Sequence, residues 1–307
     1  MRPRAPGAAE HRSVVGMTDD PFVSHRSLLF TVAYEMLGSA ADAEDVVQET
    51  WLRWADLGAA RGDVRDPRAY LVRIVARQAL NRLRTMARQR EEYVGEWLPE
   101  PLLTSPDVAE DVELAESVSF AMLTVLETLG PTERAVFVLR EVFETPYDEI
   151  AEAVDKTPAG VRQIAHRARA HVVARRPRAK VSRAEQEAVV ERFLAAVRGG
   201  DLQGLLDVLA PDVVGVADGG GVVAAFKRPI EGADRVSHLL GLLVKSAVDF
   251  EAIPMWLNGA PAARFVLDGE LYGVANLVIE DGRITRIYGI FNPHKLARLG
   301  EEAELSR

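Results

Sequence analysis

A run of cationic side chains recurs at helical spacing in residues 65–90, which hold eight arginines and one acid. At about 100° per residue, five polar side chains of this run fall within roughly 80° of one another. Apolar residues occupy the opposite side, which predicts a helix that docks on a core and presents a cationic stripe with one amide. Such a stripe suits a polyanion, whereas the alternative, a solvated helix face, usually mixes both signs of charge. The predicted stripe consists of Arg73, Arg77, Asn81, Arg84 and Arg88.

A second cationic segment spans residues 156–183, which hold nine bases and no acid. Thr157 is placed to cap a helix whose first residue is Pro158. A short helix and a turn are expected just before this cap, so the segment has the layout of a helix-turn-helix. The inward positions of its second helix are apolar, while the outward positions are Ala159, Arg162, Gln163, His166 and Arg167.

Those outward side chains are of the types that read a DNA major groove. Arginine pairs with guanine through two hydrogen bonds, and glutamine pairs in the same way with adenine. Residues near the start of a recognition helix reach base edges, whereas later arginines meet phosphates. The alternative is an ordinary helical hairpin with a basic surface. The predicted DNA contacts are Thr157, Ala159, Arg162, Gln163, His166 and Arg167, with Arg169, Arg175, Arg176 and Arg178 on phosphates.

The bulk composition limits what these patches can do. A chain of 307 residues predicts two or three domains, and a net charge of -9 argues against indiscriminate coating of nucleic acid. The sequence has neither an apolar run of transmembrane length nor a secretory signal, so we expect a cytoplasmic protein without a membrane partner. The absence of cysteine excludes disulfides and thiolate nucleophiles.

No motif for catalysis or for a cofactor stands out in the sequence. There is no Walker loop, no GxGxxG, no HExxH and no GxSxG. His166 and His171 are five residues apart, so they do not share a helix face as zinc ligands four apart would. We therefore expect no metal, no cofactor and no enzymatic activity.

Helical spacing continues through the first half of the chain, with further helices expected at 26–37, 40–57, 111–129 and 132–143. The second half changes in texture. It predicts a helix, a short helix and a strand, then another helix, then strands that are joined by tight turns. The turns are expected at Asn258-Gly259, Asp268-Gly269 and Asp281-Gly282. This order favours an α+β fold in which a curved antiparallel sheet encloses a pocket.

Three stretches of the first half resemble the extracytoplasmic-function sigma factors. "DAEDVVQETWLRW" (42–54) is similar to region 2.2, "DPRAYLVRIVARQALNRLR" (66–84) to regions 2.3 and 2.4, and residues 126–172 to region 4. The resemblance implies that the first block binds RNA polymerase core and melts the minus-ten element of promoter DNA. It implies that the second block reads the minus-thirty-five element. The residues expected to meet polymerase are Asp45, Gln48 and Glu49, whose alternative role is charge complementarity within their own helix.

The remainder resembles the SnoaL-like branch of the nuclear-transport-factor-two superfamily of cone-shaped domains. Sigma blocks with such a tail form a subgroup marked by "WLPEP", "DGGGK" and "NPxKL" motifs. Here these are residues 97–101, 218–221 and 292–296, and Val222 stands in place of the lysine. The resemblance implies that the tail regulates the sigma half in cis, through contacts within the chain. The implied regulatory residues are Trp97, Pro99, Asp218, Gly219, Asn292, Pro293 and Lys295.

The expected organisation is an all-α sigma half followed by an α+β SnoaL-like cone. The five expected segments are a disordered extension at 1–17, sigma region 2 at 18–95, a linker at 96–112, sigma region 4 at 113–178 and the SnoaL-like domain at 182–307. Pro99 and Pro101 stiffen the linker, and Trp97 and Leu98 give it side chains to bury. We expect the linker to dock on the SnoaL-like domain near Asp218 or Asn292, and to clamp the two sigma blocks.

Three functions stay open at this stage. The leading one is a sigma factor with a built-in regulatory domain. The second is a helix-turn-helix regulator that acts without polymerase core and senses a small ligand in its tail. The third is a polyketide-cyclase-like enzyme with a DNA-binding appendage, although no pair of catalytic base and orienting group is legible. The candidate pocket residues of the tail are Asp218, His238, Trp256, Tyr272, Asn276 and His294.

Overall fold

The computed structural model describes residues 20–176, 181–223, 225–245 and 248–307. The extension expected to be disordered, residues 1–17, and Arg178 lie outside the described residues. The side chains of Arg88, Gln89 and Glu91 are also outside what the structure describes. Within the described ranges, no helix combines the length and the apolar character needed to cross a membrane.

Three helices form a first bundle: α1 (Pro21–Leu37), α2 (Ala40–Asp56) and α3 (Pro67–Glu91), with the 3-10 turn η1 (Gly58–Asp63) before α3. The predicted helix boundary between α1 and α2 is confirmed. Gly38 ends α1 with a φ of 65°, which favours glycine, and the hydroxyl of Ser39 accepts a hydrogen bond from the Asp42 amide. The apolar face of α3, which includes Leu71 and Val75, is fully buried against the other two helices.

A second bundle follows a linker that contains the 3-10 turn η2 (Pro106–Glu110). Its elements are α4 (Val112–Val118), α5 (Phe120–Leu126), α6 (Pro131–Phe137) with the π turn η3 (Val138–Val142), α7 (Tyr147–Val154) and α8 (Pro158–Val173). The single helix expected over 111–129 is wrong, because Ser119 adopts a ψ of 145° and caps a new helix by accepting from the Met122 amide. The cap on α8 is confirmed, since the Thr157 hydroxyl accepts from the Gly160 amide.

The remaining elements form a tail domain of helices and one sheet. Its helices are α9 (Arg183–Gly199), α10 (Leu202–Val208), α11 (Ala233–Lys245) and α12 (Pro293–Leu296). Its strands are β1 (Leu209–Asp218), β2 (Ile230–Glu231), β3 (Phe250–Leu257), β4 (Ala260–Leu267), β5 (Glu270–Glu280) and β6 (Arg283–Ile290). The three predicted hairpin turns are confirmed, and both residues of each have a positive φ.

The six-stranded sheet is mixed, so the expectation of an antiparallel sheet is wrong. Its order is β2-β1-β6-β5-β4-β3, and β1 runs parallel to β6 while every other pair is antiparallel. The chain between β1 and β3 includes the crossover helix α11, and a long connection of that kind permits parallel pairing. As a result β1 and β6 end at the same edge, where Asp218 pairs with Ile290.

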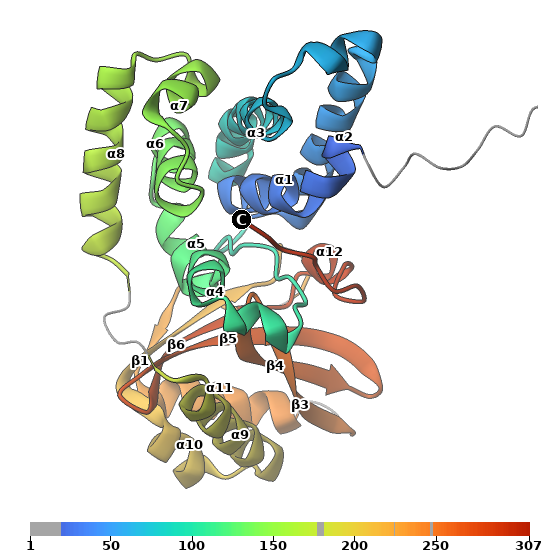
Figure 1. Ribbon diagram of the computed structural model, residues 1–307. Helices are drawn as coiled ribbons and strands as arrows, with labels where there is room; N and C mark the ends of the chain where they lie inside the picture. The colour runs from blue at the N-terminus through green and yellow to red at the C-terminus, as the bar shows by residue number, and fades with distance from the viewer. Residues whose placement is uncertain (1–19, 177–180, 224, 246–247) are drawn as a thin grey trace, which may run out of the picture.

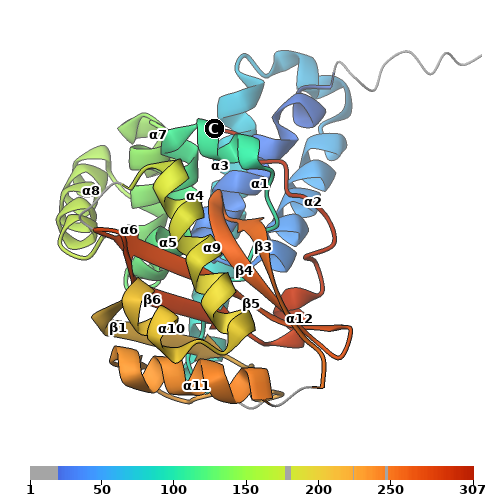
Figure 2. The ribbon, with the colours of Figure 1, turned by 90° about the horizontal axis from the view of Figure 1, so that it is seen from below.

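The sheet separates two helical layers (Figure 1). Helices α9, α10 and α11 cover one face, as the view from below shows (Figure 2). The two bundles lie side by side over the other face, and the end of the chain reaches the seam between them, where Ser306 contacts α1 and Arg307 contacts α4 (Figure 1). An apolar cluster joins the bundles and the linker to the tail domain. In it, Leu98 of the linker and Phe120 of α5 pack with Leu257, Tyr288 and Leu296 of the tail domain.

Candidate DNA-binding faces and a linker clasp

The carboxylate of Asp218 is fully buried and receives four hydrogen bonds. Its Oδ1 accepts from the hydroxyl of Tyr93 at 2.6 Å and from the amide of Gly220 at 3.0 Å. Its Oδ2 accepts from the amide of Leu98 at 2.9 Å and from Nζ of Lys295 at 2.7 Å. Tyr93 and Leu98 belong to the chain between the two bundles, so this carboxylate holds that chain to the tail domain. We call the group of Tyr93, Leu98, Asp218, Asn292 and Lys295 the clasp.

Lys295 and Asn292, which follow the end of β6, complete the clasp. Nζ of Lys295 also donates to the Leu98 carbonyl and lies 4.1 Å from the centroid of the Trp97 ring. Burial lowers the pKa of Lys295, and the Asp218 carboxylate opposes that shift. Asn292 donates to the Tyr93 hydroxyl at 2.9 Å and caps α12, whose first residue is Pro293. Removal of one partner of the buried Asp218–Lys295 ion pair is costly, because it leaves the other charge buried without compensation.

The parallel strands explain why these residues meet. Asp218 ends β1 and Asn292 follows β6, and both strands end at one edge of the sheet. The glycines after Asp218 allow the close approach: a Cβ at Gly220 would lie 2.4 Å from the Asn292 amide nitrogen, and one at Gly219 would lie 2.3 Å from the Val223 carbonyl oxygen. Val222, in the place of the motif lysine, is 62% exposed, so the cation at Asp218 comes from Lys295.

Glu100 of the linker binds the first bundle. Oε2 of the buried Glu100 accepts from the Ala40 amide at 2.8 Å and from the Ser39 hydroxyl at 3.2 Å, so a linker carboxylate caps α2. The Glu100 amide donates to the Gly38 carbonyl, and the Glu100 carbonyl accepts from the Tyr34 hydroxyl at 2.7 Å. Burial raises the pKa of Glu100, and these donors oppose the shift. Sequence reasoning missed this contact.

Trp97 and Pro99 fill the space between the two grips. The guanidinium of Arg90, at the end of α3, lies 3.7 Å from the centroid of the Trp97 ring, which the ammonium of Lys295 also contacts. Pro99 is buried and, like every proline, has no amide hydrogen to satisfy there. The docking of the linker near Asp218 and Asn292, as the sequence analysis expected, is therefore present in the structure.

Asn258 is a second junction, which sequence reasoning treated only as a hairpin turn. Its side chain is fully buried at the β3–β4 turn. Oδ1 accepts from the Leu102 amide at 3.0 Å, while Nδ2 donates to the Tyr34 hydroxyl at 2.7 Å and to the Val118 carbonyl at 3.0 Å. One amide thus joins the tail domain, the linker and both bundles. The neighbouring Leu103 pairs with β3 and with the chain end at Glu302.

Charged side chains join the two bundles directly. The Glu127 carboxylate, at the end of α5, pairs with Arg90 of α3 and with Arg134 of α6. Arg134 is 1% exposed, and its Nε donates to the Glu35 carbonyl of α1 at 3.0 Å. The sequence analysis did not single out these residues. The one sequence signal for this junction was Arg134, an arginine at a helix position that faces the core.

Glu35 is a fully buried carboxyl at this junction. Its Oε1 accepts from the Ser117 hydroxyl at 2.7 Å, while Oε2 has no hydrogen-bond partner among the described residues. Burial raises the pKa of Glu35 to about 8, and Ser117, Arg134 and Arg307 oppose the shift. Glu35 is therefore largely protonated at neutral pH in the folded chain.

The predicted cationic stripe lies on the outer face of α3, but part of it faces the second bundle. Arg73 pairs with Glu152 at 2.5 Å, and Arg77 pairs with Asp155 at 3.3 Å. Both acids belong to α7 and its end, so the helix-turn-helix unit sits against the start of the stripe. Asn81 and Arg84 are exposed, and the Arg88 side chain lies outside the described residues.

The outward face of α8 has the orientation that its sequence predicts. Val161, Ala165, Ala168 and Val172 are buried. Arg169 pairs with Glu141 at 2.7 Å, so it is engaged within the second bundle. The predicted DNA contacts Thr157, Ala159, Arg162, Gln163, His166, Arg167 and Arg169 are exposed.

The predicted polymerase contacts form an open surface on α2. Asp45, Gln48 and Glu49 are all exposed. Arg82 of α3 pairs with Asp42 at 2.5 Å and with Asp45 at 3.5 Å, and its hydrogen bond with Asp42 raises the pKa of Arg82. The α2 face thus stays accessible, while two arginines of the α3 stripe are paired with acids of the second bundle.

The polar pocket expected in the tail domain is wrong. His238 and His294 are exposed, because they lie on outward faces of α11 and α12. Asp218 is taken up by the clasp, and Asn276 is buried with an amide nitrogen that has no partner among the described residues. None of these, nor Trp256 or Tyr272, lines the cavity of about 60 Å³ under the sheet, whose described lining is apolar.

Comparison with protein families defines the class of the chain. The Sigma-70 region 2 family matches residues 22–89, which cover α1 to α3. The Sigma-70 region 4 family matches residues 119–172, which cover α5 to α8. The two helical bundles are therefore those of a sigma factor.

The similarity extends over the tail domain. The chain is 36% identical over 290 residues to the ECF RNA polymerase sigma factor SigJ of Mycobacterium tuberculosis, covering 89% of this chain and 91% of that one. It is also 36% identical over 291 residues to the probable ECF RNA polymerase sigma factor SigI of the same organism, covering 91% and 94%. The crystal structure of SigJ matches with a TM-score of 0.72 at 34% identity, over 91% of this chain and 98% of that chain.

The chain belongs to the family of ECF RNA polymerase sigma factors. The resemblance stated from the sequence motifs and the predicted fold class are confirmed. The family supports the leading function, a sigma factor, over a regulator that acts without polymerase core.

Proposed function

We propose that this sigma factor directs RNA polymerase core to promoters without being an enzyme itself, and that its tail domain restrains it in cis. It would act in the cytoplasm, where the polymerase is. The observation that carries the proposal is the double grip on the linker. Asp218 holds the linker to the tail domain, while Glu100 of the same linker caps α2 of region 2.

The restraint fixes how far apart the two bundles can be. Residues 93–104 connect region 2 to region 4 and contact the tail domain at Asp218, at Asn258 and at Trp256. Each bundle is also joined to the tail domain through the buried Asn258, which donates to Tyr34 of region 2 and to Val118 of region 4. To separate the bundles, the chain must break the direct contacts of Glu127 and Arg134 between them, and the linker must release either the clasp or α2.

The same arrangement places acids over the DNA-melting stripe. Glu152 and Asp155 of region 4 pair with Arg73 and Arg77 of region 2. DNA phosphates would compete with these carboxylates for the same guanidinium groups. The restrained state is thus expected to bind melted DNA weakly, although the polymerase face of α2 remains open.

We propose these roles for the predicted sites in the released state. The stripe with Asn81 would hold the melted minus-ten strand, and the exposed face of α8 would read the minus-thirty-five element. Asp45, Gln48 and Glu49 would contact polymerase core. The domain limits proposed from the sequence, 18–95, 96–112, 113–178 and 182–307, separate these functions.

A pair of matched variants tests the restraint. Asp218→Asn removes the carboxylate charge of the clasp, while Asp212→Asn changes an exposed acid on the same strand. Pull-down with RNA polymerase core and run-off transcription should both increase for Asp218→Asn and stay unchanged for Asp212→Asn. Equal activity of Asp218→Asn and the parent chain would exclude restraint through the clasp. Failure of every variant to bind core would exclude the polymerase partner itself.

A further inference from the structure

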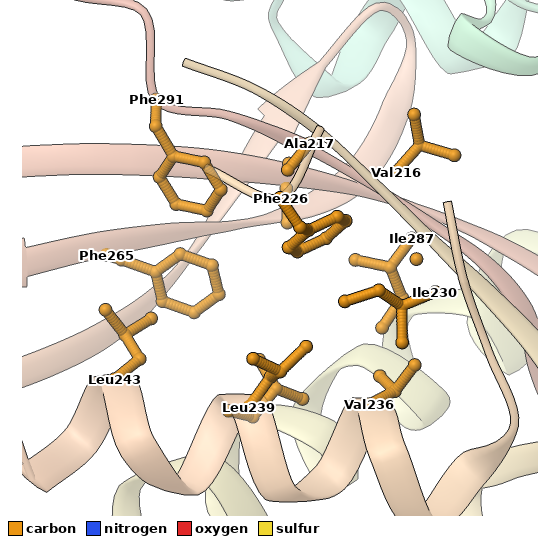
Figure 3. A pocket seen from close by; sticks show the side chains of 14 residues that line it. Val216, Ala217, Phe226, Ile230, Val236, Leu239, Leu243, Phe265, Ile287 and Phe291 are labelled. Carbon is orange, nitrogen blue, oxygen red and sulfur yellow. The ribbon is translucent and has the colours of Figure 1, made fainter. Parts of the chain in front are cut away.

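An apolar cavity of about 60 Å³ lies between the sheet and α11 of the tail domain. Figure 3 shows Phe226, Phe265 and Phe291 around it, with Val236 and Leu239 rising from α11. The described lining consists of glycine, alanine, aliphatic and phenylalanine residues. An apolar wall of this kind favours a hydrocarbon and penalises a charged or unpaired polar group.

We propose that this cavity binds a small neutral hydrocarbon group, and that its occupant stabilises the clasp. This inference rests on the proposed restraint in cis. The volume of the cavity limits the size of the ligand. An apolar cavity of about 150 Å³ admits benzene, so this smaller cavity requires a smaller group. A cavity of about 60 Å³ suits a short alkyl group or a single xenon atom.

A glycine keeps part of this space open. A Cβ at Gly215 of β1 would lie 3.6 Å from Val236 and 3.7 Å from Phe226, which are ordinary contact distances. Gly215 also has no positive φ, so its backbone does not require glycine. Gly215→Ala should therefore reduce the free volume of the cavity with little strain.

Two residues connect the cavity wall to the clasp. Ala217 and Phe291 line the cavity, and each is followed directly by a clasp residue, Asp218 and Asn292. The Phe291 amide also donates to the Asp218 carbonyl at 2.8 Å. An occupant that contacts this wall therefore acts on the backbone that holds the clasp.

The sheet limits how the Phe291 ring can move, and so how an occupant of the cavity can act on the clasp. The Phe291 ring lies so close to Gly273 and Gly289 that a Cβ there would approach it to 2.3 Å and 2.7 Å. The sheet therefore blocks movement of the ring on this side, whereas the cavity that the ring also lines gives it free volume to move into. An occupant that fits would block this movement and hold Phe291, and with it Asn292, in the closed position.

Xenon is a suitable probe, applied under pressure to the full chain with labelled methyl groups. We expect saturable NMR shifts at Ala217, Val236 and Leu239. We also expect slower hydrogen exchange of the Leu98 amide, by up to about tenfold at ten times the Kd. Gly215→Ala should remove both effects. Gly241→Ala, in the same helix as Leu239 but with no atom within 4 Å of its added Cβ, should keep both.

The outcomes separate binding from coupling. Absence of saturable shifts, or shifts that persist in Gly215→Ala, would refute the site. Shifts without any change at the Leu98 amide would refute the coupling. Neither result depends on transcription, so the restraint itself is judged separately by Asp218→Asn.

Discussion

Asn258 donates a hydrogen bond to the Tyr34 hydroxyl at 2.7 Å, although the two residues are 224 positions apart in the chain. The donor sits at a hairpin tip of the tail domain, and the acceptor is buried in region 2. The same side chain also binds the linker and α4. This one amide therefore reports whether the three parts of the chain are assembled.

Asn258→Gly should loosen this assembly without straining the turn. Asn258 has a φ of 53°, which glycine adopts freely, so the change removes only the side-chain hydrogen bonds. The Tyr34 hydroxyl, the Leu102 amide and the Val118 carbonyl lose a partner, which should cost about 2–4 kcal/mol in the free energy of unfolding. Urea unfolding measures this cost. Asp281→Gly, at an exposed turn with a φ of 50°, is the matched control and should change little.

Glu100→Ala should destabilise region 2 from a distance of 60 residues along the chain. The Ala40 amide loses its acceptor, and loss of a helix cap costs about 1–2 kcal/mol. Hydrogen exchange at the first turn of α2 should rise, while α8 stays protected. Glu96→Ala, four residues earlier in the linker, serves as control. An unchanged α2 in Glu100→Ala would mean that Ser39 caps the helix adequately alone.

Glu35 should make stability depend on pH. Its folded pKa of about 8 lies above its ordinary value of 4.5, so the folded chain holds an extra proton between these values. The stability contribution is full below about pH 4.5 and is lost as pH rises towards 8, by at most about 1.4 kcal/mol per pH unit. Glu35→Gln should flatten this slope in urea titrations. Glu44→Gln, at a partly exposed position of α2 that pairs with Arg26, should retain the slope. A slope that survives in Glu35→Gln would assign it to another group.

Removal of the acids that face the stripe should strengthen DNA binding with little effect on stability. Glu152 and Asp155 are 62% and 73% exposed, and such ion pairs contribute about 0–1 kcal/mol. The double variant Glu152→Gln, Asp155→Asn should bind a single-stranded oligonucleotide more tightly, with a steeper dependence on salt, because Arg73 and Arg77 become free for phosphates. Fluorescence anisotropy across a salt series measures both. Asp148→Asn, on an exposed position of α7, should have a smaller effect.

Local patterns predicted well those features that depend on near neighbours in the chain. Helical spacing placed the faces of α3 and α8, and paired turn residues such as Asn258-Gly259 located the hairpins. Local patterns carry no information on distant partners. Glu100 caps a helix 60 residues away, and Arg134 binds a carbonyl 99 residues away.

The sheet was mispredicted for a related reason. Three short hairpins indicate antiparallel neighbours, but the partner of β1 depends on where α11 returns the chain. The parallel pairing of β1 with β6 then decides which residues meet at the sheet edge. The resemblance to a motif-bearing family named Asp218 and Asn292, but only the strand order explains their contact.

The linker that joins Asp218 to the start of α2 has a consequence for how the protein competes for polymerase. If core binds only open chains, its apparent dissociation constant is the intrinsic one divided by the open fraction. Each 1.4 kcal/mol that favours the closed chain weakens apparent affinity about tenfold. Relatives with identical DNA-reading helices could therefore respond at very different cellular concentrations, with the threshold set by a few linker residues that touch neither DNA nor polymerase.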